Sequence, residues 1–278
     1  KNQISALGNF SAANLSLTTA SALAIDGNVT AGSIVLDASQ GVVLTGSLRA
    51  TDVAGSTTLA SGTTLQVGDG GTTGSLAGKV VNNGELVFNR SDTVSVGDAI
   101  DGSGRLVQRG SGTLALNAVN DYAGGTTIQQ GRVDVNHSLA LGTGAVAMAA
   151  NTTLGMGAAD LDIGNAIELA GASRIDTGAF NATLSSKISG DGSITKDGTG
   201  TLVLSGANTH AGGTTVAAGS LRALANGALG TGAVTVQSKA ALVLGADDSS
   251  GLAFNVGSLS GAGDVALGGN TLTTGALN

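Results

Sequence analysis

Few residues in this chain have the types and spacing that catalysis requires. Its two histidines, His137 and His210, lie 73 positions apart. A Ser-His-Asp triad needs a histidine oriented by a nearby aspartate and facing an activated serine. The serines of two glycine-rich segments, Ser103 and Ser111, lack the G-x-S-x-G spacing of a nucleophile elbow. We therefore expect both histidines to be exposed turn residues, and we predict that the chain is not an enzyme.

Two pairs of neighbouring aspartates are the remaining candidates for acid–base chemistry. They are Asp160 with Asp162, and Asp247 with Asp248. If residues 160–162 are a strand, alternation places both carboxylates on one face, where they could act on a polysaccharide or bind a cation. The other interpretation is a solvated outer face around a core Leu161, and we favour it. Sugar-cleaving grooves use aromatic side chains, and this chain has only four Phe and one Tyr.

Motifs for metals and cofactors are also weak. The segment Gly68-Asp69-Gly70-Gly71 is a fragment of the calcium-binding nonapeptide, which works in tandem copies. No glycine-rich phosphate loop with the required lysine is present. We predict no metal, no cofactor and no small-molecule pocket.

Four arginines within 43 positions are the one candidate for a binding surface: Arg90, Arg105, Arg109 and Arg132. Stacked segments of chain could bring two or three of them together as a basic spot for an anionic glycan or a host protein. The alternative is a set of solvated turn residues. No single residue is identifiable as a binding hot spot.

The composition excludes several classes of protein. The chain has 278 residues, 47 Gly, no Pro, no Cys, 41% hydrophobic and 11% charged residues, and a net charge of −7. Disorder requires higher charge and lower hydrophobicity, and a disulfide scaffold requires cysteines. The negative charge argues against nucleic acid as a partner. The absence of an initial Met or a signal sequence leads us to expect an excised fragment.

Internal repetition is the strongest signal in the sequence. Residues 104–148 align without a gap on residues 192–236, an offset of 88, with 20 identities in 45 positions. Short apolar-x-apolar segments recur within this repeat and before it, for example Leu65-Gln66-Val67 and then Leu86-Val87-Phe88. We interpret the offset as four coils of about 22 residues each, a length typical of solenoid repeats.

Very short strands that recur at about 20 to 25 residues, with no helix between them, predict a solenoid. The fold class is therefore all-β: a single-stranded parallel β-helix of about 12–13 coils, forming a rod on the order of 60 Å long. Every strand of such a fold pairs on both sides, which explains the absence of Pro, and glycines supply its corners. Asn120 and Asn208 are expected to stack in corner ladders. We predict one domain over 1–278, loosely repeated in 1–60 and regular in 62–278.

The repeated segments resemble the passenger-associated transport repeat of Gram-negative autotransporters. The resemblance rests on Asn120–Ile128 (NDYAGGTTI) and Asn208–Val216 (NTHAGGTTV), each after a G-x-G-x-Leu-x-Leu segment. Residues 65–71 and 81–88 are also similar to such passengers, and residues 257–263 resemble the start of another copy. One departure is His210, where the family usually has Tyr.

This resemblance implies a right-handed β-helix that is secreted or anchored at the outer membrane of a Gram-negative bacterium, through a C-terminal β-barrel beyond Asn278. It also implies an adhesin or an autoaggregation stalk, whose coil-wise folding supports secretion. The expected partners are host cell surfaces, extracellular matrix or neighbouring bacterial cells. Two alternatives stay open: the passive stem of a serine protease with its catalytic domain before Lys1, and a polysaccharide-acting β-helix enzyme.

Overall fold

The computed structural model describes residues 4–246 and 250–275, and these form strands, turns and loops. Two compact units make up the chain. Unit 1 comprises Lys1–Val133 and Leu139–Gly144, and unit 2 comprises Asp134–Ser138 and Ala145–Asn278. The boundary falls within β17 (Arg132–Val135). The single domain expected from the sequence stays a prediction.

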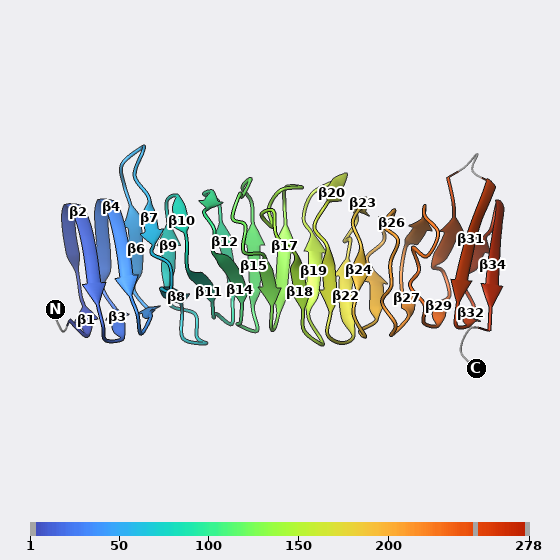
Figure 1. Cartoon of the computed structure of the whole chain (residues 1–278), viewed down its shortest axis with the longest axis horizontal. Helices are drawn as coiled ribbons and strands as arrows, with labels where there is room; N and C mark the ends of the chain where they lie inside the picture. Colours follow the sequence, from blue (N-terminus) through green and yellow to red (C-terminus); the bar gives the residue numbers. More distant parts are fainter. Residues whose placement is uncertain (1–3, 247–249, 276–278) are drawn as a thin grey trace. The chain divides into compact units, whose positions relative to one another are not determined.

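Unit 1 is a parallel solenoid whose strands fall on three sides (Figure 1, blue to green). The first side consists of β1 (Ala6–Leu7), β3 (Leu23–Ile25), β5 (Val42–Leu44), β8 (Thr64–Val67), β11 (Glu85–Phe88), β14 (Arg105–Gln108) and β16 (Thr126–Ile128). The second consists of β2 (Phe10–Thr19), β4 (Asn28–Ala38), β6 (Ser47–Ala50), β7 (Thr57–Leu59), β9 (Ser75–Ala77), β10 (Val80–Asn82) and β13 (Ile100–Asp101). The third pairs β12 (Thr93–Val96) with β15 (Thr113–Leu116).

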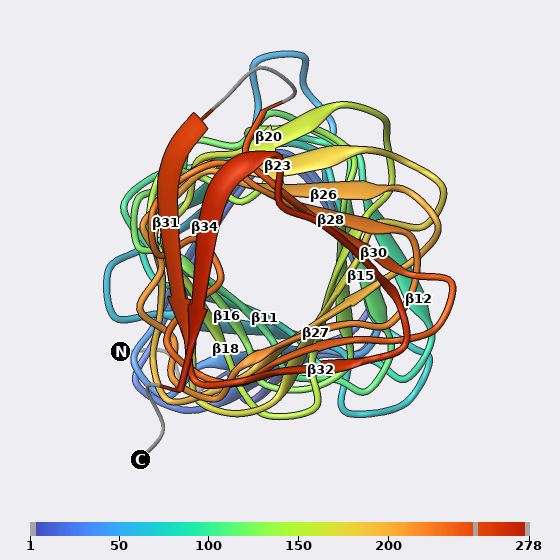
Figure 2. The same ribbon diagram turned by 90° about the vertical axis from the view of Figure 1, so that its right-hand side faces the viewer.

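Unit 2 has the same organisation. Its strands fall into four sets, and Figure 2 shows β26, β28 and β30 on one side and β31 and β34 on another. The sets are β18 (Val146–Met148), β21 (Ile167–Leu169) and β24 (Ile188–Ser189); β19 (Thr153–Met156), β22 (Ser173–Asp176), β25 (Ile194–Asp197), β27 (Thr214–Val216), β29 (Val234–Val236) and β32 (Leu259–Gly261); β20 (Leu161–Ile163), β23 (Ala182–Leu184), β26 (Thr201–Leu204), β28 (Ser220–Ala223), β30 (Ala241–Leu244) and β33 (Asp264–Ala266); and β31 (Ser250–Val256) with β34 (Gly269–Thr274).

These pairings confirm the predicted fold class: an all-β parallel solenoid, with about 13 turns over the two units. None of the described residues belongs to a helix long and apolar enough to cross a membrane.

Stacked residues of the repeat region lie closer in the sequence than the predicted 22 positions. Leu86 pairs with Leu106, so the numbers of these stacked residues differ by 20. Ile167 pairs with Ile188, where the difference is 21. Four coils of this length fall short of the offset of 88, so the sequence repeat is not a whole number of coils.

The interior is filled by one residue in two along most strands. In β15 and β26 the two leucines are fully buried while the residue between them is half-buried. Inward columns such as Ile25, Leu44, Val67 and Phe88 continue from coil to coil in register. Alternation of this kind is what short, half-buried strands require.

Glycines stand at corners where adjacent coils touch through their backbones. A Cβ added to Gly104 would lie 2.2 Å from the carbonyl oxygen of Gly84, the matching corner of the previous coil. Gly97, between β12 and β13, has nothing within 4 Å of its own added Cβ. The first glycine is therefore required by stacking and the second is not.

This difference predicts the outcome of two alanine substitutions. Gly104→Ala should lower the free energy of unfolding by about 1–3 kcal/mol or more, because the methyl group forces two coils apart. The matched control, Gly97→Ala, should be neutral or stabilising by up to about 1 kcal/mol. Equilibrium denaturation followed by circular dichroism measures both, and equal losses would contradict this account of the corners.

Candidate functional site

An asparagine at the same position of each sequence repeat bridges three coils. Asn120 accepts a hydrogen bond from the Ile100 amide (2.9 Å) and donates to the Ala140 carbonyl (2.6 Å). Asn208 does the same between the Ile188 amide (2.8 Å) and the Ala228 carbonyl (2.6 Å). Both side chains are buried. The expected ladders of stacked asparagines are not what holds the corners; each asparagine bonds to backbone in the coils before and after it.

This bridging occurs where the repeat has no strand. Residues 117–125 and 205–213 are loops on a side of the coil where other coils have β-structure. Without a strand, the backbone groups of Ile100 and Ile188 lose a ladder partner, and buried unpaired groups are costly. An asparagine side chain carries both an acceptor and a donor group, so it can replace a missing peptide group.

A second buried pair follows two residues later, with Tyr122 in one repeat and His210 in the other. The Tyr122 hydroxyl lies 2.6 Å from Thr126 Oγ1, which donates to the Leu141 carbonyl (3.2 Å). The side chains of Tyr122 and Thr126 are both buried. Burial raises the pKa of the Tyr122 phenol well above its ordinary value.

His210 occupies the equivalent place in the second repeat. Its Nε2 lies 2.9 Å from Thr214 Oγ1, which donates to the Leu229 carbonyl (2.9 Å). The side chain is fully buried, so the expected exposed turn histidine is wrong at this position. Burial lowers the pKa of His210 to about 4. His137 is exposed, as expected.

Glycines of the Leu-Gly-Thr-Gly segment accommodate these two rings. A Cβ on Gly142 would lie 2.9 Å from the Tyr122 ring, and one on Gly230 would lie 2.7 Å from the His210 ring. Both glycines also have positive φ angles, 66° and 74°, where other residues are strained. The Asn, the aromatic ring of Tyr or His, the Thr and the Gly therefore form one buried cluster in each repeat.

The third buried polar position holds different residues in the two repeats. Gln108 lies in an inward column between Phe88 and Ile128, and its Nε2 donates to the carbonyls of Gly110 (2.9 Å) and Gly112 (3.1 Å). The equivalent residue of the second repeat is Lys196, inward between Ile175 and Val216.

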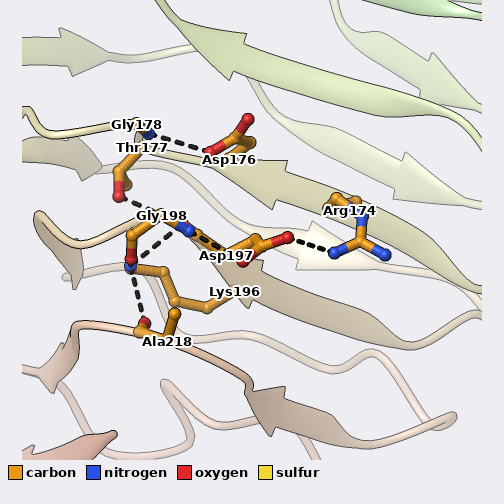
Figure 3. Close-up of polar contacts among 8 residues, drawn as sticks. All are labelled: Arg174, Asp176, Thr177, Gly178, Lys196, Asp197, Gly198 and Ala218. Atoms are coloured by element: carbon orange, nitrogen blue, oxygen red, sulfur yellow. Dashed lines mark hydrogen bonds and ion pairs between the residues drawn. The ribbon is translucent and has the colours of Figure 1, made fainter.

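Lys196 is fully buried, yet its ammonium group has three acceptors (Figure 3). Nζ donates to the carbonyls of Asp197 (3.0 Å), Gly198 (2.7 Å) and Ala218 (3.0 Å). Burial lowers its pKa to about 8, against the opposing effect of the Asp197 and Asp176 carboxylates. Asp197 also pairs with Arg174 on the surface. Lys196 was not predicted from the sequence, although its place two residues after the inward Ile194 marks it as an interior position.

Two of the four predicted arginines meet on the outer face of unit 1. Arg105 pairs with Glu85 (2.7 Å), and Arg109 lies 4.0 Å from the same carboxylate. Arg109 also donates to Gln66 (2.9 Å), two coils earlier, and to Gln129 (3.3 Å), one coil later. We call these five residues the outer polar network.

The outer polar network covers an apolar stripe. Val87 and Val107 point outward, between Gln66 and Thr127 in register, yet they are 0% and 1% exposed. The long side chain of Arg109 spans this stretch to reach Gln66, in the way that arginine stems cover apolar surface. Beside the network, a groove of about 360 Å³ is lined by Thr64, Asn83, Glu85, Ser103, Arg105 and corner glycines.

The remaining two arginines lie elsewhere. Arg90 makes a two-point ion pair with Asp92 (2.8 and 2.6 Å) and donates to the Gly74 carbonyl. The guanidinium holds the pKa of Asp92 below its ordinary value. Arg132 is half-buried at the start of β17. Because Arg90 and Arg105 each have a carboxylate partner, the expected basic spot is a mixed-charge surface.

The aspartate candidates do not assemble into a site. Asp162 is exposed on β20 between buried Leu161 and Ile163, and Asp160 precedes the strand with a φ of 54°. The two carboxylates therefore do not share a strand face as alternation suggested. Asp247 and Asp248 lie outside the described residues.

The calcium-like segment is a local turn. The Asp69 carboxylate accepts a hydrogen bond from the Gly71 amide (3.3 Å). Over residues 4–246 and 250–275, no group of three or more His, Asp or Glu side chains could hold a metal ion.

Comparison with known proteins identifies a family to which the two repeats are similar. The family model of the passenger-associated transport repeat matches residues 106–135 and 194–223. These segments contain Asn120 to Thr126 and Asn208 to Thr214. The chain is also 34% identical over 178 residues, 62% of its length, to the adhesin BmaC autotransporter of Brucella suis biovar 1 (strain 1330). No solved structure matches the chain.

The chain carries two passenger-associated transport repeats, of the kind found in autotransporter passengers, on a parallel β-solenoid. The passenger is accordingly secreted, or held at the outer-membrane surface, of a Gram-negative bacterium. The matched region spans about 5% of the length of the curated relative. Activities and partners of a whole autotransporter are therefore matters for proposal.

The bridging role of the buried asparagines predicts the effect of an alanine substitution on stability. Asn208→Ala should lower the free energy of unfolding by about 2–4 kcal/mol, because a buried amide and a buried carbonyl both lose their partner. Asn181 is the control: it is exposed and accepts one bond from the Thr201 amide. Asn181→Ala should cost less than about 1 kcal/mol in the same denaturation experiment. Equal losses would show that coil bridging is not what the buried asparagine contributes.

The hydrogen bonds of Lys196 predict how two substitutions at this position affect stability. Lys196→Gln, which introduces the residue of the first repeat, should stay within about 1 kcal/mol of wild type because it still donates to a corner carbonyl. Lys196→Ala should lose about 2–4 kcal/mol through the cavity and the unpaired carbonyls. Denaturation of the three chains under the same conditions measures both differences, and an equal loss in both variants would contradict it.

The pH dependence of that comparison follows from the lowered pKa. Unfolded chains bind more protons at this lysine than folded chains between about pH 8 and pH 10.5, so its contribution to stability rises with pH in that window and is lost as the pH falls. The stability of wild type relative to Lys196→Gln should increase from pH 7 to pH 9.5. An unchanged difference would contradict the burial of the ammonium group.

Proposed function

We propose that the passenger is a non-enzymatic adhesin or autoaggregation stalk. The outer polar network supports this proposal: it presents paired charges and amides over several coils, with an apolar stripe directly beneath. A surface of this kind makes many weak contacts along its length and few deep ones. Its expected partners are host surfaces, extracellular matrix or the same protein on another cell. The similarity to a relative named as an adhesin points the same way.

A second role is to support secretion across the outer membrane. We infer this from the bridging asparagines, since each one completes its hydrogen bonds only when the coils before and after it are in place. Solenoid stability is carried by interfaces between neighbouring repeats, so one folded coil templates the next. Folding that proceeds outside the cell in this way would draw the remaining chain outward.

Adhesion is tested with the purified chain on beads. Beads carrying residues 1–278 are scored for clumping and for attachment to host cells and matrix proteins, against beads carrying an unrelated β-helix. We expect clumping or attachment above that background. Inert beads would contradict an adhesive role for these coils.

The same assay tests the surface proposed here. The double variant Arg105→Ala and Arg109→Ala should reduce attachment at least several-fold, because it removes the charges through which the network makes its contacts. The control is Arg49→Ala, an exposed arginine on β6 outside the network. Circular dichroism confirms that each variant is folded, and an equal effect of both variants would exclude the network as the contact surface.

A further inference from the structure

Besides Gln108 and Lys196, the two sequence repeats differ at a second buried position, which holds Tyr122 in one and His210 in the other. In the first repeat, Tyr122 bonds through its hydroxyl to Thr126. In the second, His210 bonds through Nε2 to Thr214. The surrounding pattern of Asn, Thr and Gly is shared, so the repeats are a natural pair for comparing the two rings.

Hydrogen bonding determines which tautomer His210 adopts. The Thr214 hydroxyl has one proton and donates it to the Leu229 carbonyl. Its oxygen therefore accepts from the ring, and Nε2 carries the proton of the neutral imidazole. This leaves Nδ1 as an unprotonated nitrogen, and Nδ1 is buried with no hydrogen-bond partner.

Protonation at low pH must add a proton to that nitrogen. The result is a buried positive charge with an N–H that has no acceptor, and both features are costly. The ring cannot easily turn away, since it packs directly against the backbone of Gly230.

Nearby charged groups do not offset this cost. The segment of the following coil that bonds to the His210 loop, residues 224–233, contains no ionisable side chain. The preceding coil pairs with the His210 loop through Ile188 and Gly190, and its ionisable residues there, Lys187 and Asp191, are both exposed. Burial is the cause of the lowered pKa of His210, about 4 against an ordinary 6.5.

We propose that His210 is an acid-sensitive switch: its protonation opens the coil that contains it in unit 2, while the matching coil at Tyr122 in unit 1 stays closed. The neutral ring supports the coil fully above about pH 6.5. That support is lost as the pH falls from 6.5 towards 4, because the open coil binds the proton that the closed coil excludes. A passenger in an acidified environment would then expose the buried edge of this coil first.

Amide hydrogen exchange of the full chain tests the proposal at defined positions. The Ala211 amide bonds to Gly190 and the Thr231 amide to His210 itself, whereas Ala123 and Thr143 hold the equivalent places around Tyr122. After correction for intrinsic rates, protection at Ala211 and Thr231 should fall on the order of 50-fold between pH 7 and pH 4.5. Protection at Ala123 and Thr143 should change far less.

Reciprocal substitution supplies the controls. His210→Tyr should abolish the acid-dependent loss in unit 2, and Tyr122→His should create one in unit 1. His137→Gln, which removes the other, exposed histidine, should leave the profile unchanged. An equal loss of protection in wild type and His210→Tyr would overturn the proposal.

One measurement needs no variant. With two histidines in the chain, their imidazole signals can be followed by NMR as a function of pH. His210 should titrate well below the ordinary histidine value of 6.5, or be replaced by signals of an opened coil before it titrates. A His210 midpoint at the ordinary value of 6.5, with the coil still closed, would overturn the proposal even if the substituted chains failed to fold.

Discussion

The structure depends on one requirement: each coil must satisfy the backbone polar groups of the coil before and the coil after it. Strands meet this requirement where they exist, because parallel ladders leave no free peptide group between two neighbours. At the loops of the transport repeats there is no strand, and the asparagine side chains of Asn120 and Asn208 take the place of a peptide group. The asparagines of the repeat motif are thus buried side chains that take the place of missing peptide groups. Its glycines leave room for the adjacent rings to pack.

The same requirement explains what the sequence could predict. A chain without Pro, with 47 Gly and with short apolar alternation fits only a fold whose strands are paired on both sides and whose corners are tight. The two motif copies identified the family because Asn, Gly and Thr recur at fixed spacing. The fold class and the exposed state of His137 followed directly from such local patterns.

Other features depend on contacts between coils and could not be predicted from the sequence pattern. Coil length was overestimated because the offset of 88 was divided into four whole coils, whereas stacked residues of the repeats lie 20 or 21 positions apart. Arg90 and Arg105 were grouped by sequence distance, but their carboxylate partners, Asp92 and Glu85, decide their charge environment. His210 was expected to be a turn residue because histidine is polar; its burial follows from the shape of the coil, which holds a tyrosine ring at the equivalent position. The interior position of Lys196 was detectable from alternation alone. The three carbonyls that accept hydrogen bonds from its ammonium group were not.

Protection of the Ile188 amide from hydrogen exchange tests the central claim most directly. This amide bonds to the side chain of Asn208, whereas Leu202 lies inside a ladder of the same unit, paired with Ala182 on one side and Leu221 on the other. If asparagine side chains complete the coil-to-coil network, Ile188 should be protected to a similar degree as Leu202 at neutral pH. Exchange of Ile188 at the rate of an open loop, with Leu202 still protected, would contradict the account.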